Sequence, residues 1–484
     1  FAHSPDERNE KTGAGGGADH KRLSALPIGN SDKGNALRAL HVRAEMTAGN
    51  RIRKGSPRRG LMELPDGVGK IFRAILIAGF FTTELWAQDA AKPANPQIAA
   101  LALPTGARAD WQQWDSFLTN VVKKLGEGFR PAQRDQLVDT FLDARYQLVG
   151  ALRSGISDPV PQLFTDTWNR LSPIIKQAMP GTAKQTASQY TSFVSAMDAA
   201  SSYSGLGQSL GLFRITPDAL RGAARLLGTG EPDPLAYTVN VDSGLRGLLG
   251  FTGELPAPQP SPRLEQGRWQ RLQDKASAAA RSLMLRPAFA AETDLSRLNQ
   301  WVPDNQELQE YLLQVRQLLT EVSDRVLAKS TLAQEHRQLY RQIVFTTGWQ
   351  ESCWRQFIKK GEKLAPLTST TGDFGLMQVN RITWRSLYDV TGLSGDIRYN
   401  GLSGAEILHQ YLTRHAIAKK EDQQPGGHLA RATYSAYNAG PGGLARYRGV
   451  RQSLEWKKVD EAFWTKFQQV SSGQELAVKS CYVK

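Results

Sequence analysis

Three short blocks in the C-terminal third of the chain carry side chains that could do acid–base chemistry. The blocks are Trp349-Gln350-Glu351-Ser352, Gly375-Leu376-Met377-Gln378 and Ala436-Tyr437-Asn438-Ala439-Gly440. They offer a carboxylic acid that can exchange a proton, together with an amide and a phenol that can hold a polar substrate. Each block by itself is weakly specific. All three in this order within about 90 residues form a much more specific pattern.

The three blocks resemble those of the soluble lytic transglycosylase domain, which belongs to the lysozyme-like superfamily. Ser369 and Gly372 also match the Ser-x-x-Gly that precedes the second block in that family. The resemblance covers roughly residues 330–455, about a quarter of the chain. It implies a lysozyme-like helical domain that cleaves the β-1,4 bond between MurNAc and GlcNAc in bacterial peptidoglycan. It says nothing about residues 88–300.

The resemblance implies that Glu351 alone acts as both acid and base. Glu351 would protonate the leaving oxygen and then accept the proton of the sugar's 6-hydroxyl, which closes a 1,6-anhydro ring without consuming water. A raised pKa suits both roles, and Trp349, Trp354 and Phe357 predict an apolar setting for this acid. The substrate-binding residues that the resemblance implies are Ser352, Gly375, Leu376, Met377, Gln378, Tyr437, Asn438, Ala439 and Gly440.

Some of these residues have simpler structural interpretations. The Ser352 hydroxyl could cap a helix, and Met377 could pack in the core, which is the commoner role for methionine. Aromatic rings that could stack on sugars are Phe374, Trp384 and Tyr447, although an aromatic side chain more often lies in the core.

The stretch between Glu351 and Gly375 departs from the family pattern. It is longer than usual by a turn or two, and Asp373 stands where the family has a small residue. If Asp373 or Asp389 faced Glu351 with room for a water molecule, the reaction would be hydrolysis of the lysozyme kind. An aspartate in a loop turn is the simpler interpretation of Asp373.

Helical periodicity dominates the chain upstream of these blocks. Apolar spacing predicts helices from Trp111, from Pro131, over 162–178, 185–200 and 217–227, and from a capping box at Asp304 and Glu307 along a stripe from Leu308 to Val326. The best short strand candidate is Tyr237–Val241. The predicted fold class is mainly α, with a C-terminal lysozyme-like α domain preceded by a helix-rich module of unknown fold.

Composition shifts along the chain predict its domain organisation. We expect a leader or non-native extension (1–61), a signal peptide (62–87), a flexible leader (88–110), a helical module (111–250), a Pro-rich linker (251–265), a helical connector (266–330), a catalytic domain (331–455) and a C-terminal tail (456–484).

The segment after Met62 is typical of a secretory signal peptide. Lys70 and Arg73 precede the apolar run 74–81, and Ala87 offers a small residue for cleavage. The run is too short to span a bilayer as a stable helix, although it could instead be a buried helix. We therefore expect export to the periplasm and no stable membrane span.

The two cysteines, Cys353 and Cys481, could pair in an oxidising compartment or remain thiols. Together with seven histidines they show no metal-ligand spacing, so neither a metal nor a cofactor is expected.

The formal net charge is +14, and residues 88–484 retain +9. This charge suits an anionic partner, and peptidoglycan and teichoic or lipid surfaces fit it equally well. Nucleic acid is not an expected partner, because no zinc-finger, Gly-rich RNA-binding or basic-helix pattern occurs. The alternatives to a transglycosylase are a muramidase resembling goose-type lysozyme and a catalytically silent wall-binding protein. A further possible partner is an envelope protein, which the helical module could recruit.

Overall fold

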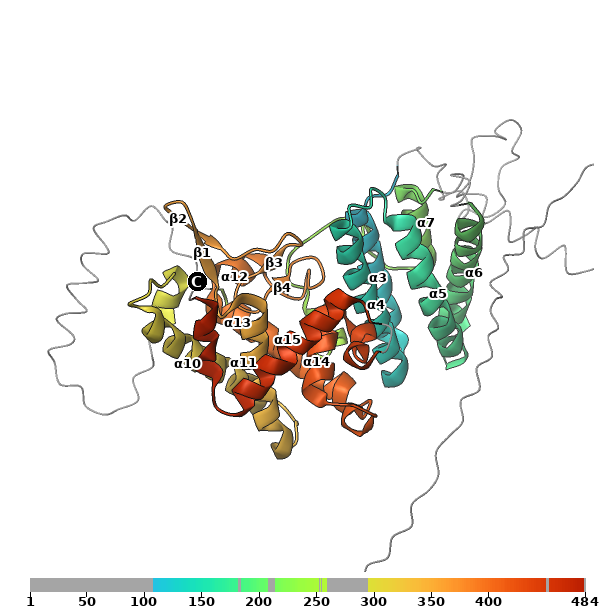
Figure 1. Ribbon diagram of the computed structural model, residues 1–484. Helices are drawn as coiled ribbons and strands as arrows, with labels where there is room; N and C mark the ends of the chain where they lie inside the picture. The colour runs from blue at the N-terminus through green and yellow to red at the C-terminus, as the bar shows by residue number, and fades with distance from the viewer. Residues whose placement is uncertain are drawn as a thin grey trace, which may run out of the picture. The chain divides into compact units, whose positions relative to one another are not determined.

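The computed structural model describes residues 108–181, 184–207, 214–251, 253, 255–258, 295–449 and 452–482 (Figure 1). The predicted extension (1–61), the signal peptide (62–87), the flexible leader up to residue 107 and the part of the connector over 266–294 lie outside the described residues. The described residues all belong to one compact unit. The expected division into a helical module and a catalytic domain remains a prediction.

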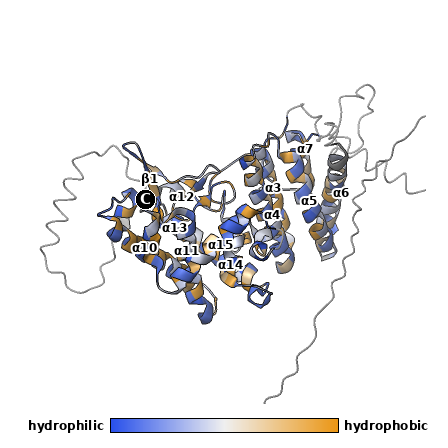
Figure 2. Ribbon diagram, in the orientation of Figure 1, coloured by the Kyte–Doolittle hydropathy of each residue, from blue (hydrophilic) through white to orange (hydrophobic). Residues whose placement is uncertain are grey.

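The predicted helices upstream of the Pro-rich segment are present. They are α3 (Trp111–Gly128), α4 (Pro131–Arg153), α5 (Val160–Ala178), α6 (Lys184–Gly207) and α7 (Pro217–Leu227). The short helix α8 (Ser243–Leu248) and the 3-10 turn η2 (Met179–Gly181) are present as well and were not predicted. Asp110 and Gln113 form a capping box that starts α3, and Pro131 occupies the first turn of α4, where no backbone N–H is needed. Each helix buries apolar side chains against its neighbours. Figure 2 shows hydrophobic and hydrophilic residues alternating along these helices.

The strand predicted over Tyr237–Val241 is wrong, because these residues form no regular element. A strand needs a neighbour for its backbone hydrogen bonds, and none of the described segments pairs with this one. Instead, the carbonyl oxygen of Thr238 accepts a hydrogen bond of 2.6 Å from Arg385, and the Tyr237 ring packs edge-on against Trp111.

The C-terminal part is also mainly helical. Its α-helices are α10 (Leu308–Ala328), α11 (Gln334–Ser352), α12 (Val390–Gly395), α13 (Ile397–Gln410), α14 (Leu429–Ala439) and α15 (Leu454–Ser471). Shorter turns are η4 (Leu295–Gln300), the π-helical η5 (Tyr411–Ile417), η6 (Glu421–Gln423), η7 (Pro441–Gly443), η8 (Arg446–Arg448) and η9 (Glu475–Cys481). The mainly-α prediction is therefore confirmed.

The predicted capping box at Asp304 is only half formed. The Asp304 carboxylate accepts hydrogen bonds from the backbone N–H groups of Gln306 and Glu307, both at 2.9 Å. The Glu307 side chain does not reach back to Asp304, since it accepts instead from Arg297 and from Trp301. Helix α10 accordingly begins at Leu308.

Four short strands form two antiparallel pairs. β1 (Phe357–Lys360) pairs with β2 (Lys363–Pro366), and β3 (Asp373–Phe374) pairs with β4 (Val379–Asn380). The β1–β2 hairpin accounts for much of the unusually long stretch between Glu351 and Gly375. Gly361 turns this hairpin at a φ of 61°, a conformation that glycine adopts without strain.

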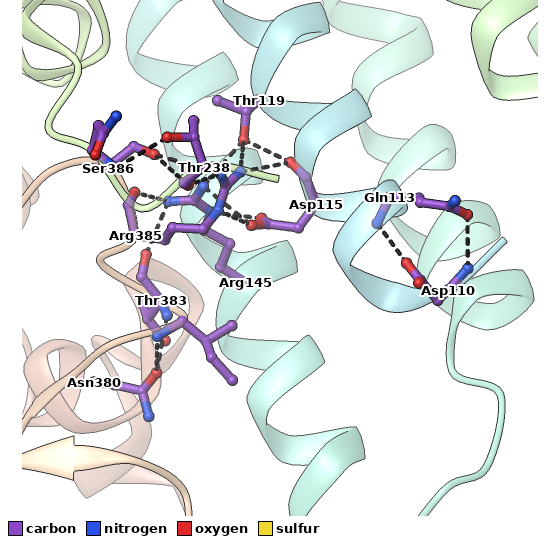
Figure 3. Close-up of polar contacts among 12 residues, drawn as sticks. Asp110, Gln113, Asp115, Thr119, Arg145, Thr238, Asn380, Thr383, Arg385 and Ser386 are labelled. Carbon is purple, nitrogen blue, oxygen red and sulfur yellow. Dashed lines mark hydrogen bonds and ion pairs between the residues drawn. The ribbon is translucent and has the colours of Figure 1, made fainter. Parts of the chain in front are cut away.

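A buried ion network joins α3 and α4 to the loop that precedes α12 (Figure 3). The two oxygens of Asp115 accept from Arg145 Nε at 2.8 Å and from Arg385 Nε at 2.5 Å, and all three side chains are at most 2% exposed. Arg145 also donates to the carbonyl oxygens of Thr383 and Arg385. Burial lowers the pKa of Arg145 to about 10, so it keeps its charge at neutral pH. The network therefore fixes α4 against the C-terminal part.

Among the described helices, none has the length and apolar character needed to cross a membrane.

Candidate active site

Glu351 lies in the last turn of α11, where the chain changes direction. Cys353 follows with a φ of 54° and Trp354 with a φ of 61°, both in the left-handed region. Several interactions hold this turn. A disulfide joins Cys353 to Cys481, and Trp354, which is fully buried, donates from its indole N–H to the carbonyl oxygen of Phe345. Of the two alternatives for the cysteines, the structure has the paired one, and the disulfide anchors the C-terminal tail two residues from Glu351.

Glu351 is partly buried, and its surroundings favour the protonated form. Desolvation by burial is the main cause that raises its pKa to about 7, and the negative charge of Asp373 raises it further. A hydrogen bond of 2.9 Å from the Tyr434 hydroxyl to Oε1 opposes the rise, as do the positive charges of Lys466 and Arg446. A carboxyl group with a pKa near neutrality can both give and take a proton.

Ser352 connects the first block to the second. Its hydroxyl lies 2.6 Å from the carbonyl oxygen of Leu376 and 3.0 Å from that of Gly348. The side chain is buried and does not line the cleft described below. Ser352 therefore positions the end of α11 relative to the second block.

The second block is held by buried amide side chains. Gln356 accepts from the backbone N–H of Leu376 at 2.8 Å, and Asn400 accepts from that of Met377 at 2.8 Å. Gly375 has a φ of 68°, and a Cβ there would lie 2.1 Å from Gln356 Oε1. The side chains of Leu376 and Met377 are fully buried in the core, so only their backbone lies near the site.

A cleft of about 840 Å³ surrounds Glu351, within the range of small-ligand sites. From the C-terminal part it is lined by Glu351, Thr371, Asp373, Gln378, Asn380, Thr383, Trp384, Tyr437, Asn438, Ala439, Gly442, Trp456 and Val459. The cleft thus brings together Glu351, Gln378, Tyr437, Asn438 and Ala439 from the predicted set. Ser352, Gly375, Leu376, Met377 and Gly440 do not line it.

The side chains from the third block are fixed in different ways. The Tyr437 hydroxyl donates to the carbonyl oxygen of Met377 at 2.6 Å, which ties the third block to the second. The Asn438 side-chain oxygen accepts a hydrogen bond of 2.9 Å from Arg446 Nη1. Because this bond uses the oxygen, the Asn438 N–H₂ group can act as a donor toward a ligand.

Asp373 also lines the cleft, whereas Asp389 caps α12 by accepting from the backbone N–H of Gly392. One carboxylate oxygen of Asp373 accepts from the hydroxyls of Ser369 and Thr371, and the other accepts from Asn380 Nδ2 at 2.7 Å. These donors hold Asp373 in its loop with its charge close enough to Glu351 to raise the pKa of the latter.

The opposite wall of the cleft comes from the helical module. It consists of Asp143, Tyr146, Gln147, Val149, Gly150 and Arg153 of α4, with Ser154 and with Arg170 of α5. The Tyr146 hydroxyl donates to the carbonyl oxygen of Tyr437 at 2.7 Å. Sequence patterns did not identify this wall, because its residues stand almost 300 positions before the third block.

Two further features of the site, Tyr434 and the aromatic residues of the cleft, were only weakly indicated by the sequence. Tyr434, which binds Glu351, stands three residues before Tyr437 and thus on the same side of α14. Of the three proposed stacking aromatics only Trp384 lines the cleft, where Trp456 lies as well, 39% exposed and with the Arg446 guanidinium over its ring.

Comparisons of the chain with protein-family models, with curated proteins and with solved structures found no match.

Proposed function

We propose that the chain is a peptidoglycan lytic transglycosylase with a lysozyme-like catalytic domain, in which Glu351 is the single acid and base. The observation that carries the proposal is the position of Glu351. A carboxyl group with a pKa of about 7 lies in a cleft that Gln378, Tyr437 and Asn438 line from the other two sequence blocks. Polar amides beside aromatic rings suit an N-acetylated sugar chain.

The two carboxyl oxygens of Glu351 have different hydrogen-bond environments, so we assign them different roles in the reaction. Oε1 accepts from Tyr434, and none of the described side chains donates to Oε2. Protonated Oε2 gives its proton to the leaving glycosidic oxygen. The ionised group then takes the proton of the muramyl 6-hydroxyl as that oxygen attacks the anomeric carbon. The glycosidic bond breaks, the 1,6-anhydro ring forms, and Glu351 regains its proton.

Hydrolysis of the same bond is the second candidate, and the position of Asp373 favours it. Two carboxylates in one cleft can activate a water molecule against the sugar ring. The three donors to Asp373 favour instead a fixed charge that raises the pKa of Glu351. A transglycosylase is therefore the preferred proposal.

Digestion of purified sacculi followed by mass analysis of the released muropeptides tests both candidates. Anhydro ends weigh one water less than reducing ends, so anhydro products support the transglycosylase and reducing ends support the hydrolase. Glu351→Gln should lower release by roughly 100-fold or more, the usual contribution of a general acid. The matched control is Glu335→Gln, an exposed acid in the first turn of the same helix. Release that is unchanged in Glu351→Gln would refute the mechanism.

Export to the periplasm and recruitment of an envelope protein through the helical module remain part of this proposal. Both can be tested by fractionation of the native host and by crosslinking of the exported protein.

A further inference from the structure

Helix α4 is part of the cleft and is held there by direct contacts with the third sequence block. Besides the bond from Tyr146 to Tyr437, the Asp143 carboxylate accepts from the backbone N–H of Gly442 at 2.8 Å. A Cβ on Gly440 would lie 2.9 Å from the Tyr146 ring and 3.0 Å from Asp143. The glycine at the end of the third block therefore permits this close approach of α4.

The last residue on the face of α4 that lines the cleft is the cationic Arg153. Tyr146, Gly150 and Arg153 are separated by four and three residues, so they share one side of the helix. Arg153 lies two turns beyond Tyr146, which is roughly 10 Å along the axis. Its side chain is exposed at the cleft.

Arg153 differs from the other arginine of this wall. Arg170 Nη2 donates to Asp143 at 2.6 Å, so its charge is already paired. Within the described ranges, no carboxylate pairs with Arg153. Three acids line the cleft. Asp143 shares the α4 wall with Arg153, but its charge is paired with Arg170. Glu351 and Asp373 belong to the other wall, so an anionic group entering the cleft is repelled there and attracted at Arg153.

Peptidoglycan carries an acidic peptide on the lactyl group of its muramyl sugars. An extended peptide covers about 10 Å in three residues. A muramyl sugar bound beside Tyr437 could therefore place a carboxylate from the first few residues of its peptide at Arg153. A guanidinium binds a carboxylate through two parallel hydrogen bonds.

We infer that the end of α4 forms a subsite for the acidic stem peptide, with Arg153 binding a peptide carboxylate, so that the protein prefers peptide-bearing strands to bare glycan. This inference rests on the proposed function for the placement of the sugar. It assigns to the helical module a role in substrate selection within the cleft itself.

The test measures binding to the whole chain carrying Glu351→Gln, which leaves the ligand intact. Calorimetry compares three ligands: a muramyl disaccharide, the same disaccharide with its stem peptide, and the free peptide. The peptide-bearing disaccharide should bind more tightly than the other two, and this advantage should weaken with added salt. Adding Arg153→Gln should reduce the advantage threefold to tenfold, and Arg153→Lys should restore part of it.

Arg130→Gln is the matched control, because Arg130 is an exposed arginine that precedes the other end of α4 and does not line the cleft. This variant should keep the full preference. Equal affinity for the two disaccharides, or equal weakening of both by Arg153→Gln, would overturn the inference. Tight binding of the free peptide alone would also overturn it, since the sugar would then play no part.

Cleavage assays separate this inference from the proposed function. Wild-type protein that cleaves bare strands and peptide-bearing strands equally well retains the proposed function and lacks the subsite. Wild-type protein that binds with the expected preference and cleaves neither strand retains the subsite and refutes the proposed function.

Discussion

The Tyr434 hydroxyl donates a hydrogen bond of 2.9 Å to Glu351 Oε1. The phenol itself is buried, and its own pKa is raised well above the ordinary value by burial and by the adjacent carboxylate. Tyr434 thus remains a neutral donor over the whole useful pH range. Its hydrogen bond stabilises the ionised form of Glu351, whereas burial and the charge of Asp373 destabilise that form.

The first prediction concerns the alkaline limb of the pH–activity profile. If Glu351 must be protonated to act, kcat/KM falls as pH rises through its pKa of about 7. Tyr434→Phe removes a hydrogen bond that lowers this pKa, so the limb should move to higher pH. Asp373→Asn removes a charge that raises it, so the limb should move to lower pH. Shifts in the same direction for both variants would contradict the assignment.

The second prediction concerns stability. Because the pKa of Glu351 is raised from 4.5 to about 7 in the folded protein, folding opposes its ionisation. The penalty is absent below pH 4.5 and complete above pH 7. Glu351→Gln should therefore be as stable as wild type in acid and more stable at pH 8, by up to about 3 kcal/mol. Urea unfolding at both pH values measures this difference, and a constant difference across pH would contradict it.

The third prediction concerns the buried network around Asp115. Asp115→Asn removes the charge that compensates Arg145 and Arg385, so it should cost about 3–5 kcal/mol of unfolding free energy. Asp324→Asn is the matched control, because Asp324 pairs with Arg341 at the surface and should cost at most about 1 kcal/mol. Comparable losses in the two variants would show that the network contributes little.

The fourth prediction distinguishes two costs of replacing Gly375 by alanine: the strain of a positive φ and the steric clash of the added Cβ. Gly361 and Gly375 both have positive φ, but a Cβ on Gly361 meets no atom within 4 Å, whereas one on Gly375 meets Gln356. Gly361→Ala should cost about 1–2 kcal/mol from the left-handed backbone alone. Gly375→Ala should cost clearly more and should also lower activity, because Gln356 holds the second block. Chemical denaturation and glycan release measure the two effects, and equal costs would refute the steric argument.

The fifth prediction concerns the disulfide between Cys353 and Cys481, which encloses 128 positions of sequence. Replacing both cysteines by serine should cost about 2–4 kcal/mol, largely by freeing the unfolded chain. Reducing agent should lower the unfolding midpoint of wild type and leave the double variant unchanged. A reducing agent that affects both proteins alike would contradict the link.

Local chemistry along the chain was sufficient for much of the fold. The apolar period predicted α3, α4, α5 and α7 to within two residues at their starts, since a helix that buries one face must repeat apolar residues at this spacing. The strand predicted over Tyr237–Val241 was wrong because a strand depends on a neighbour that its own sequence does not specify. Its alternation fits a strand, but whether a partner lies beside it depends on the rest of the chain.

The sequence by itself also determined the first members of the candidate site. Glu351, Gln378, Tyr437 and Asn438 stand in short blocks whose residue types suggest their chemistry, and the structure brings them to one cleft. Their neighbours in sequence carry the same signal, yet Leu376 and Met377 point into the core. Spacing along the chain could not distinguish the residues that line the cleft from those that are buried. In the second block the turn at Gly375 decides which side chains face the cleft.

Only the tertiary structure decided what stands opposite Glu351. Tyr146 and Arg153 belong to a helix that shares no motif with the three blocks, and the contact between Tyr146 and Tyr437 spans 291 positions. Such a contact leaves no periodic trace in the sequence, because it arises where two separately folded faces meet. The Asp115 network and the glycine at position 440 fix that meeting, and burial in the resulting cleft is what raises the pKa of Glu351.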